Sequence, residues 1–147
     1  MKKIILIVTN NAGDIHTNEV IRIINLQNTH EVVFVDTEFF GENWSLSIDF
    51  NNQPSSFLEI NDRRIFAKDI KAVWWRKPTP VNIKYMKDEM ATFIFKETND
   101  TIYGFLWVLE AIGSLIINHP FYNYAASIKP KQLILSLIHI SEPTRPY

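Results

Sequence analysis

Two cations follow a pair of tryptophans where a predicted strand ends, and their position suits them to binding chemistry. Arg76 and Lys77 come directly after Trp74 and Trp75. A guanidinium at such a place can hold a carboxylate or a phosphate through paired hydrogen bonds, and the indoles exclude water and strengthen the contact. In the alternative interpretation the tryptophans belong to the core and the cations only extend to solvent. The residues alone leave both interpretations open.

Polar residues also follow the other predicted strands. Thr9-Asn10 follows the first strand, Asp36-Thr37-Glu38 the second and Asn118-His119 the last. The carboxyl ends of parallel strands share one edge of an open sheet, and ligands approach that edge. The candidate ligand-cleft residues are therefore Arg76, Lys77, Asn118 and His119.

Asp14 and His16 could form a carboxylate–imidazole pair, but their spacing disfavours it. Residues two apart do not share a helix face. Asp14 is more simply the N-cap of the helix that follows, with Thr17 as the alternative cap. No histidines pair at the spacing of metal ligands and the chain has no cysteine, so we expect no metal site.

Several function classes are disfavoured by composition and motifs. The turn after the first strand has a single glycine, Gly13, and no phosphate loop is present, which argues against nicotinamide and P-loop enzymes. A net charge of -1 gives no reason to expect nucleic-acid or membrane partners. The apolar run after Lys3 is too short for a signal peptide. The lack of cysteine is compatible with the cytoplasm, where we expect the protein to reside.

The elements that position these residues can be predicted from apolar spacing. Residues 4–8 and 32–35 are β-branched runs typical of buried parallel strands, and helical spacing from Ile15 separates them. Such a β-α-β unit is right-handed. An antiparallel hairpin insert follows, in which Leu46, Ile48 and Phe50 alternate with polar residues and residues 57–60 return. Asn61-Asp62 forms a further turn.

The second half of the chain predicts two more strands and two helices. Residues 72–75 form a short strand, whose alternation should bury Trp74 and Trp75 on opposite faces beneath helices. Apolar spacing over residues 83–112 predicts one long helix, straight or bent near residues 98–100. Gly104 should cost this helix about 1 kcal/mol unless another backbone packs there. Gly113 ends it, residues 115–117 form a strand, and a last helix begins around Tyr124. The fold class is α/β: an open, mostly parallel, Rossmann-like sheet with flanking helices and an antiparallel hairpin insert.

A basic run from Arg63 to Lys87 contains one acid, Asp69. Apart from Arg76 and Lys77, we interpret these cations as ordinary solvated surface charges.

The last residues do not read as evolved protein. Residues 135–145, LSLIHISEPTR, match without a mismatch the translation of a transposon-tagmentation sequencing adapter. We therefore expect one native domain over residues 1–134 and a non-native tail over residues 135–147. A natural C-terminal strand with a Pro-rich tail is the alternative.

Four motifs in this order carry a family resemblance. They are Asp14-Ile15-His16, the segment from Val73 to Pro78, Ile117-Asn118-His119-Pro120, and Ala126 with Lys129, Gln132 and Leu133. Residues 1–134 resemble the N-terminal pre-ATP-grasp domain of microviridin-maturing ATP-grasp ligases, and less closely the ribosomal-protein glutamate ligases. That family typically shows two arginines after the tryptophans, where this chain has Arg76-Lys77.

The resemblance implies a ligase that spends ATP to join side chains of a precursor peptide as amides or esters. It implies ATP and Mg²⁺ in the full-length enzyme, held by domains absent from this fragment, so the fragment itself should be inactive and bind no cofactor tightly. Lys129 would lie where such ligases place a phosphate-reaching lysine, next to Pro130. The alternatives are a ligase that adds free amino acids, or a non-enzymatic binding or dimerisation module. Whether the protein forms a homodimer is left open by the sequence.

Overall fold

The computed structural model describes residues 2–10, 14–78, 88–130 and 132–134. The chain divides into two compact units, Met1–Ile117 and Asn118–Tyr147. The tail at residues 135–147 and the cations Lys84 and Lys87 lie outside the described residues.

A four-stranded parallel sheet forms the centre of the first unit. Its strands are β1 (Lys3–Val8), β2 (His30–Val35), β6 (Ile70–Trp75) and β7 (Leu115–Ile117), in the order β2-β1-β6-β7. Val8 at the end of β1 pairs with Val35 on one side and with Trp75 on the other. The carboxyl ends of these three strands therefore meet at one edge, as the sequence predicts.

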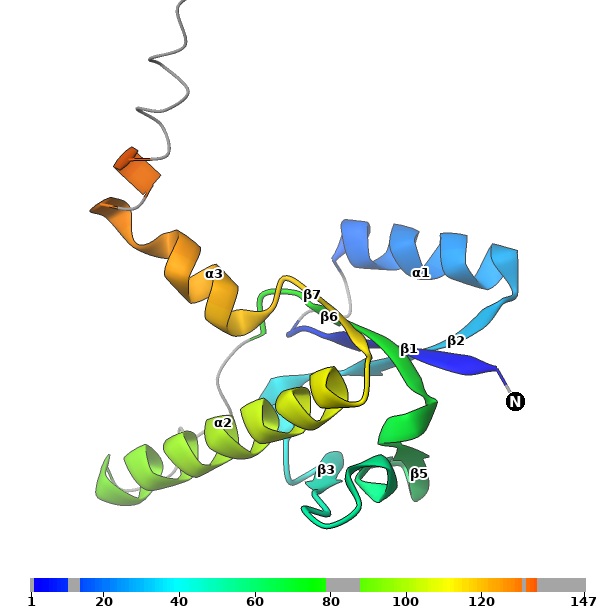
Figure 1. Cartoon of the computed structure of the whole chain (residues 1–147), viewed down its shortest axis with the longest axis horizontal. Helices are drawn as coiled ribbons and strands as arrows, with labels where there is room; N and C mark the ends of the chain where they lie inside the picture. Colours follow the sequence, from blue (N-terminus) through cyan, green and yellow to red (C-terminus); the bar gives the residue numbers. More distant parts are fainter. Residues whose placement is uncertain (1, 11–13, 79–87, 131, 135–147) are drawn as a thin grey trace, which may run out of the picture. The chain divides into compact units, whose positions relative to one another are not determined.

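Helix α1 (Ile15–Gln27) connects β1 to β2 and lies on one face of the parallel sheet (Figure 1). Its N-cap is Asp14, whose side chain accepts a hydrogen bond from the backbone N–H of Thr17. The helix ends at Asn28, which takes a left-handed conformation with φ 53°. The predicted cap and the predicted β-α-β opening are both confirmed.

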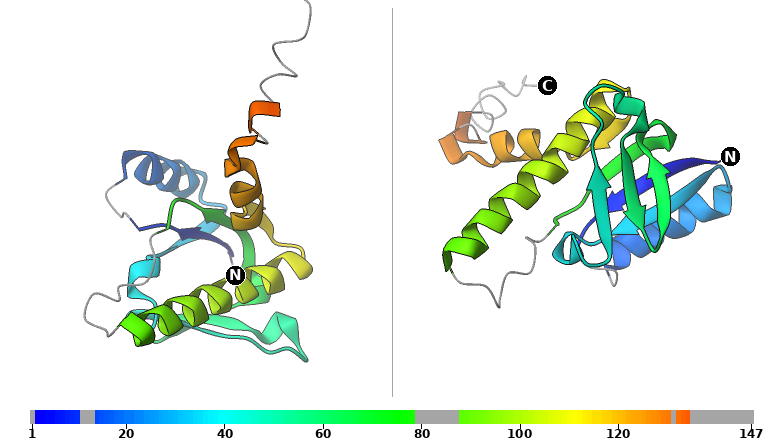
Figure 2. Two further views of the ribbon diagram at one scale, coloured as in Figure 1. Left: turned by 90° about the vertical axis from the view of Figure 1, so that its left-hand side faces the viewer. Right: turned by 90° about the horizontal axis from the view of Figure 1, so that it is seen from below.

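A separate antiparallel sheet contains β3 (Trp44–Ser47), β4 (Phe57–Ile60) and β5 (Arg63–Phe66) (Figure 2). The sequence predicts the hairpin of β3 and β4, but not the third strand. In β5 only Ile65 is buried, and two exposed arginines hide its apolar alternation. Asn61 and Asp62 both have positive φ, as a tight two-residue hairpin turn requires. Three 3₁₀ turns, η1 (Thr37–Phe39), η2 (Gln53–Ser55) and η3 (Ala67–Asp69), complete the connections.

The prediction that Phe50 belongs to the hairpin is wrong. Phe50 follows the end of β3 and is 85% exposed. The carboxylate of Asp49 accepts hydrogen bonds from the backbone N–H groups of Asn51 and Asn52 and from the hydroxyl of Ser55. These bonds turn the chain before Phe50 can pair in the sheet.

Helix α2 (Asp88–Ala111) is uninterrupted through residues 98–100 and lies on the face of the parallel sheet opposite α1 (Figure 1). No backbone packs closely at Gly104; the nearest neighbour of an added methyl group would be the Ile48 side chain, at 3.4 Å. Gly113, with φ 89°, lies just past the helix end. Its N–H bonds to the carbonyl of Glu110, and the N–H of Ser114 to that of Leu109, which is a Schellman motif.

The hydrophobic core lies between the parallel sheet, α2 and the antiparallel sheet. Trp75 is 9% exposed, belongs to this core, and its ring lies 5.9 Å from that of Tyr103 on α2. Trp74 points to the opposite face and is only half-buried. The prediction that both indoles are buried beneath helices is therefore confirmed for Trp75 and wrong for Trp74. Helix α1 covers the sheet face on which Trp74 lies only in part, since Thr17 is the single buried residue of this helix.

The second unit contains helix α3 (Pro120–Ser127). It begins four residues before the predicted start at Tyr124. Proline at the first helical position lacks only an N–H that would have no helical partner there, and its fixed φ suits a helix start. His119 precedes it as the N-cap.

Candidate functional site

Arg76 lies at the carboxyl edge of the parallel sheet, where the sequence places it. Its backbone N–H donates to the carbonyl of Val8 at 2.8 Å, and the N–H of Thr9 donates to that of Val35 at 3.1 Å. These two bonds continue the sheet pattern one residue beyond the strands. They fix the backbone of Arg76 beside the end of β1.

The Arg76 side chain forms an ion pair with Asp14. Its Nε donates to Asp14 Oδ2 at 2.9 Å, and the two side chains are 22% and 23% exposed, Arg76 first. The guanidinium carbon lies 5.4 Å from the centre of the Trp74 ring, in a cation–π contact. Arg76 is therefore a half-buried cation whose position is fixed between an indole ring and a carboxylate.

Asp14 joins Arg76 to helix α1. Its Oδ2 also accepts from the backbone N–H of Thr17 at 3.1 Å and from the Thr17 hydroxyl at 2.8 Å. Hydrogen bonds from Arg76 and Thr17 hold the pKa of the Asp14 carboxyl far below its ordinary value of 3.8. The hydrogen bond from the Thr17 N–H confirms the interpretation of Asp14 as a helix cap, and His16 is exposed. The contact with Arg76 is one that sequence reasoning missed.

Lys77 is exposed and has an unusual backbone conformation. Its φ of 43° lies in the left-handed region, and the next residue is Pro78. Proline disfavours helical conformations in the residue before it, so Lys77 carries strain beside the candidate site.

The acidic residue at the end of β2 has a structural role. The side chain of Asp36 accepts a hydrogen bond from the backbone N–H of Glu38 and caps η1. Its carbonyl accepts one from Trp44 Nε1 at 2.6 Å. Thr9 at the end of β1 is buried. These strand-end residues hold the turns in place around the edge.

Asn118, His119 and Lys129 belong to the second unit. Asn118 has φ 59°, and its carbonyl accepts a hydrogen bond from Asn123 Nδ2 at 2.9 Å. His119 Nδ1 accepts from the backbone N–H of Phe121 at 3.3 Å, as the cap of α3. Lys129 is exposed.

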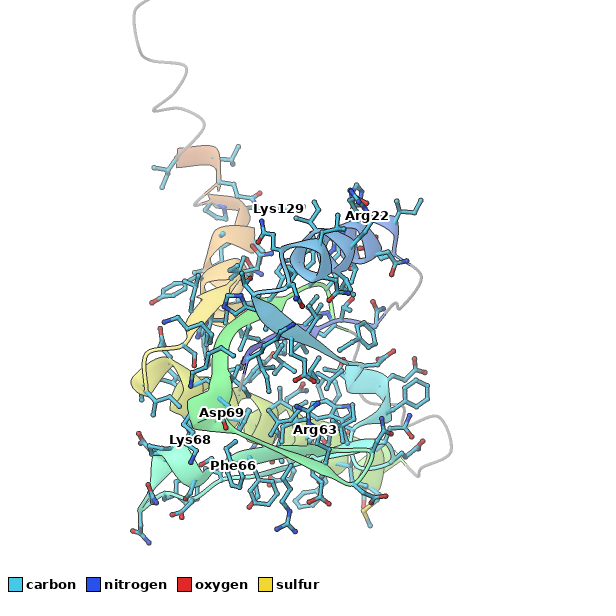
Figure 3. All side chains as sticks on the ribbon, turned by 90° about the vertical axis from the view of Figure 1, so that its right-hand side faces the viewer. Arg22, Arg63, Phe66, Lys68, Asp69 and Lys129 are labelled. Carbon is cyan, nitrogen blue, oxygen red and sulfur yellow. The ribbon has the colours of Figure 1, made fainter. Side chains whose placement is uncertain are left out.

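The cations around β5, among them Arg63 and Lys68 (Figure 3), lie exposed on the surface, as expected. Arg63 binds both carboxylate oxygens of Glu31, Arg64 binds Glu59, and Asp69 pairs with Lys3. The Arg63 guanidinium lowers the pKa of the Glu31 carboxyl. Lys68 and Arg64 also lie over the rings of Phe66 and Phe57. Arg63, Arg64 and Lys68 therefore have partners outside the candidate site.

The described part of the chain contains no group of three or more metal-ligating side chains. None of its helices combines the length and the apolar character needed to span a bilayer.

The parallel sheet, the separate antiparallel sheet and the Arg76–Asp14 pair at the carboxyl edge are those of an α/β domain of the pre-ATP-grasp class. The chain belongs to the family of MvdD pre-ATP grasp domains, whose model matches residues 4–119. No curated protein matches the chain.

Solved structures of peptide-modifying enzymes share this fold. The macrocyclase MdnB from Microcystis aeruginosa MRC has a TM-score of 0.78 and 21% identity over 91% of this chain and 43% of its own. A RiPP-associated ATP-grasp ligase from Chryseobacterium gregarium, solved with ADP and a leader and core peptide, has a TM-score of 0.75 and 23% identity, covering 92% and 40%. The ATP-grasp ligase PsnB, solved with precursor peptide PsnA2 and AMPPNP, has a TM-score of 0.69 and 26% identity, covering 89% and 42%. The chain thus spans less than half the length of these enzymes.

Proposed function

We propose that this chain is the N-terminal domain of an ATP-grasp peptide ligase that crosslinks side chains of a ribosomal precursor peptide. The observation that carries the proposal is membership of the MvdD pre-ATP-grasp family over residues 4–119. Structures of similar enzymes with precursor peptides support a peptide partner.

In the proposed reaction an acidic side chain of the peptide is activated at the expense of ATP. An amine or hydroxyl side chain of the same peptide then attacks it, giving an amide or an ester. PsnB has been solved with Mg and ADP, which supports the same cofactors in the complete ligase. The domains that hold them would follow residue 134, so this chain would supply binding surface rather than catalysis. We assign the reaction to the cytoplasm.

Arg76 is the residue to which we assign peptide binding in this domain. A guanidinium at the ligand-facing edge of a parallel sheet suits an acidic side chain, since the two groups form paired charge-assisted hydrogen bonds. Lys77 is proposed to line the same cleft in the complete enzyme. Asn118 and His119, in the second unit, are proposed as further ligand-binding residues of that enzyme. Lys129 is proposed to reach a phosphate of ATP.

Replacing Arg76 in the complete ligase tests the proposal. Arg76→Ala should lower the rate of peptide crosslinking at least about tenfold, equivalent to about 1.4 kcal/mol of activation free energy. The melting temperature should change by no more than about 4 °C, because Arg76 lies outside the core. Crosslinking is followed by mass spectrometry as the loss of one water per bond.

Arg22→Ala is the matched control, because Arg22 forms an exposed pair with Glu19 on α1. Its crosslinking rate should equal that of the wild type. A fully active Arg76→Ala enzyme would show that Arg76 does not take part in peptide binding and has only a structural role. A product that gains amino-acid residues instead of losing water would favour the amino-acid-adding ligase.

A further inference from the structure

Arg76 uses only part of its hydrogen-bonding capacity in the described structure. A guanidinium carries five N–H donors. The Nε–H of Arg76 bonds to Asp14 Oδ2, and among the described residues Nη1 and Nη2 have no hydrogen-bond partner. Within the described part of the chain, the two terminal nitrogens are therefore available to bind a ligand.

The position of this guanidinium is fixed from both ends. Its backbone is bonded to the end of β1 through Val8, and its Nε is bonded to Asp14. Asp14 is in turn bonded to the N–H and the hydroxyl of Thr17, which is fully buried in α1. Helix α1 and strand β1 together hold the cation in one geometry.

The surroundings of Arg76 favour a singly charged ligand. The Trp74 ring lies against the guanidinium and excludes water from that side, which strengthens a contact with a ligand. Asp14 already offsets the charge of Arg76, and Lys77 is the next cation along the chain. A net charge near +1 complements one carboxylate better than a phosphate dianion.

We propose that Asp14 is a positioning residue that holds Arg76 so that Nη1 and Nη2 together bind one side-chain carboxylate of an acidic peptide. The identity of the ligand rests on the proposed function. The contacts that hold Arg76 in place are observed independently of that function. Positioning a binding group in advance raises affinity because less freedom is lost when the ligand arrives.

Direct binding to the chain tests this inference without the ligase reaction. The probe is N-acetyl-glutamate amide, whose only charge is its side-chain carboxylate. N-acetyl-glutamine amide is the uncharged comparison and inorganic phosphate the alternative anion, all at constant ionic strength. NMR signals of the Arg76 Nε–H and the Trp74 indole N–H report binding. We expect saturable shifts with the glutamate probe, none with the glutamine probe and weaker binding of phosphate.

Asp14→Ser separates positioning from simple charge. Serine still caps α1 but is too short to reach Arg76 Nε. Removing a negative charge should by itself strengthen anion binding, whereas loss of positioning should weaken it. We expect the glutamate probe to bind at least about fivefold more weakly. Arg76→Lys, which keeps the charge but loses the fork, should weaken binding similarly.

Glu19→Gln is the matched control, because it removes another carboxylate of α1 that binds an arginine. It should leave probe affinity unchanged. If Asp14→Ser does not fold, Asp14→Thr replaces it, because threonine also caps helices and is likewise too short to reach Arg76 Nε. Unchanged or tighter binding by the folded variant overturns the positioning role. Absence of binding by the wild-type chain overturns the site.

Failure of the proposed function would look different. Wild-type binding that is weakened in Asp14→Ser, with no crosslinking by the complete ligase, would retain the carboxylate site and reject the peptide-ligase proposal.

Discussion

At the scale of single residues, Asp14 makes two contacts, of which the sequence predicts only the helix cap. It caps α1 through Thr17 and pairs with Arg76, which lies 62 positions along the chain. Both contacts favour the ionised carboxylate and depress its pKa. The ion pair and the helix start are therefore linked through one carboxylate.

This linkage predicts a specific pH dependence. The pKa of Asp14 is lower in the folded than in the unfolded chain, so the stabilisation is present above the ordinary value of 3.8 and is lost as the pH falls through the folded-state pKa. Arg76→Gln should raise the pKa of Asp14 towards the ordinary value and leave the pKa of Glu19, which is lowered by Arg22, unchanged. An NMR titration of the carboxyl carbons measures both. An Asp14 pKa that does not move would contradict the ion pair.

The two neighbouring tryptophans should differ in their contribution to stability. Trp75→Ala should cost about 3–5 kcal/mol, because the indole is 9% exposed and packs in the main core. Trp74→Ala should cost about 1–2 kcal/mol, because its ring is only half-buried. Urea unfolding of both variants measures the difference. Equal losses would show that Trp74 is as deeply packed as Trp75.

At the scale of elements, the glycine inside helix α2, Gly104, and the glycine just past its end, Gly113, have opposite conformational requirements. Gly104→Ala should stabilise the chain by about 0.5–1 kcal/mol, since alanine favours the helix and its methyl group meets only the Ile48 side chain, at 3.4 Å. Gly113→Ala should destabilise it by about 1 kcal/mol, because φ 89° is unfavourable for alanine. Thermal unfolding of the pair tests both signs. Destabilisation by Gly104→Ala would mean that Ile48 cannot move aside.

Strand β5 of the antiparallel sheet could not be predicted from the pattern of apolar residues. Strand β5 has one buried residue, Ile65, and its arginines pair with Glu31 and Glu59 across the surface. Charged side chains are common on edge strands because they discourage pairing with other chains. The same charges make the segment resemble a loop in sequence.

At the scale of the whole molecule, the hydrophobic core formed by the described residues lies in the first unit, from Ile4 to Ile116. Deleting residues 135–147 should therefore leave the melting temperature within about 2 °C of the intact chain. Differential scanning calorimetry of the two chains makes the comparison. A larger decrease would assign the tail a part in folding, against its interpretation as adapter-derived sequence.

The sequence by itself determined the parallel strands, the helices between them, the cap of α1 and the family. β-branched runs, helical spacing and capping residues are local signals, which record how a single element is buried. Arg76 at the sheet edge was predictable for the same reason, because it directly follows a strand.

Only the tertiary structure decided which side chains meet. The sequence offers Asp14 as a cap and Arg76 as a ligand-binding cation. Their contact depends on β1 and β6 lying side by side with Val8 opposite Trp75. The partial exposure of Trp74 depends likewise on how far α1 extends over the sheet. Contacts between distant residues follow from the register and packing of whole elements, which no local pattern in the chain encodes.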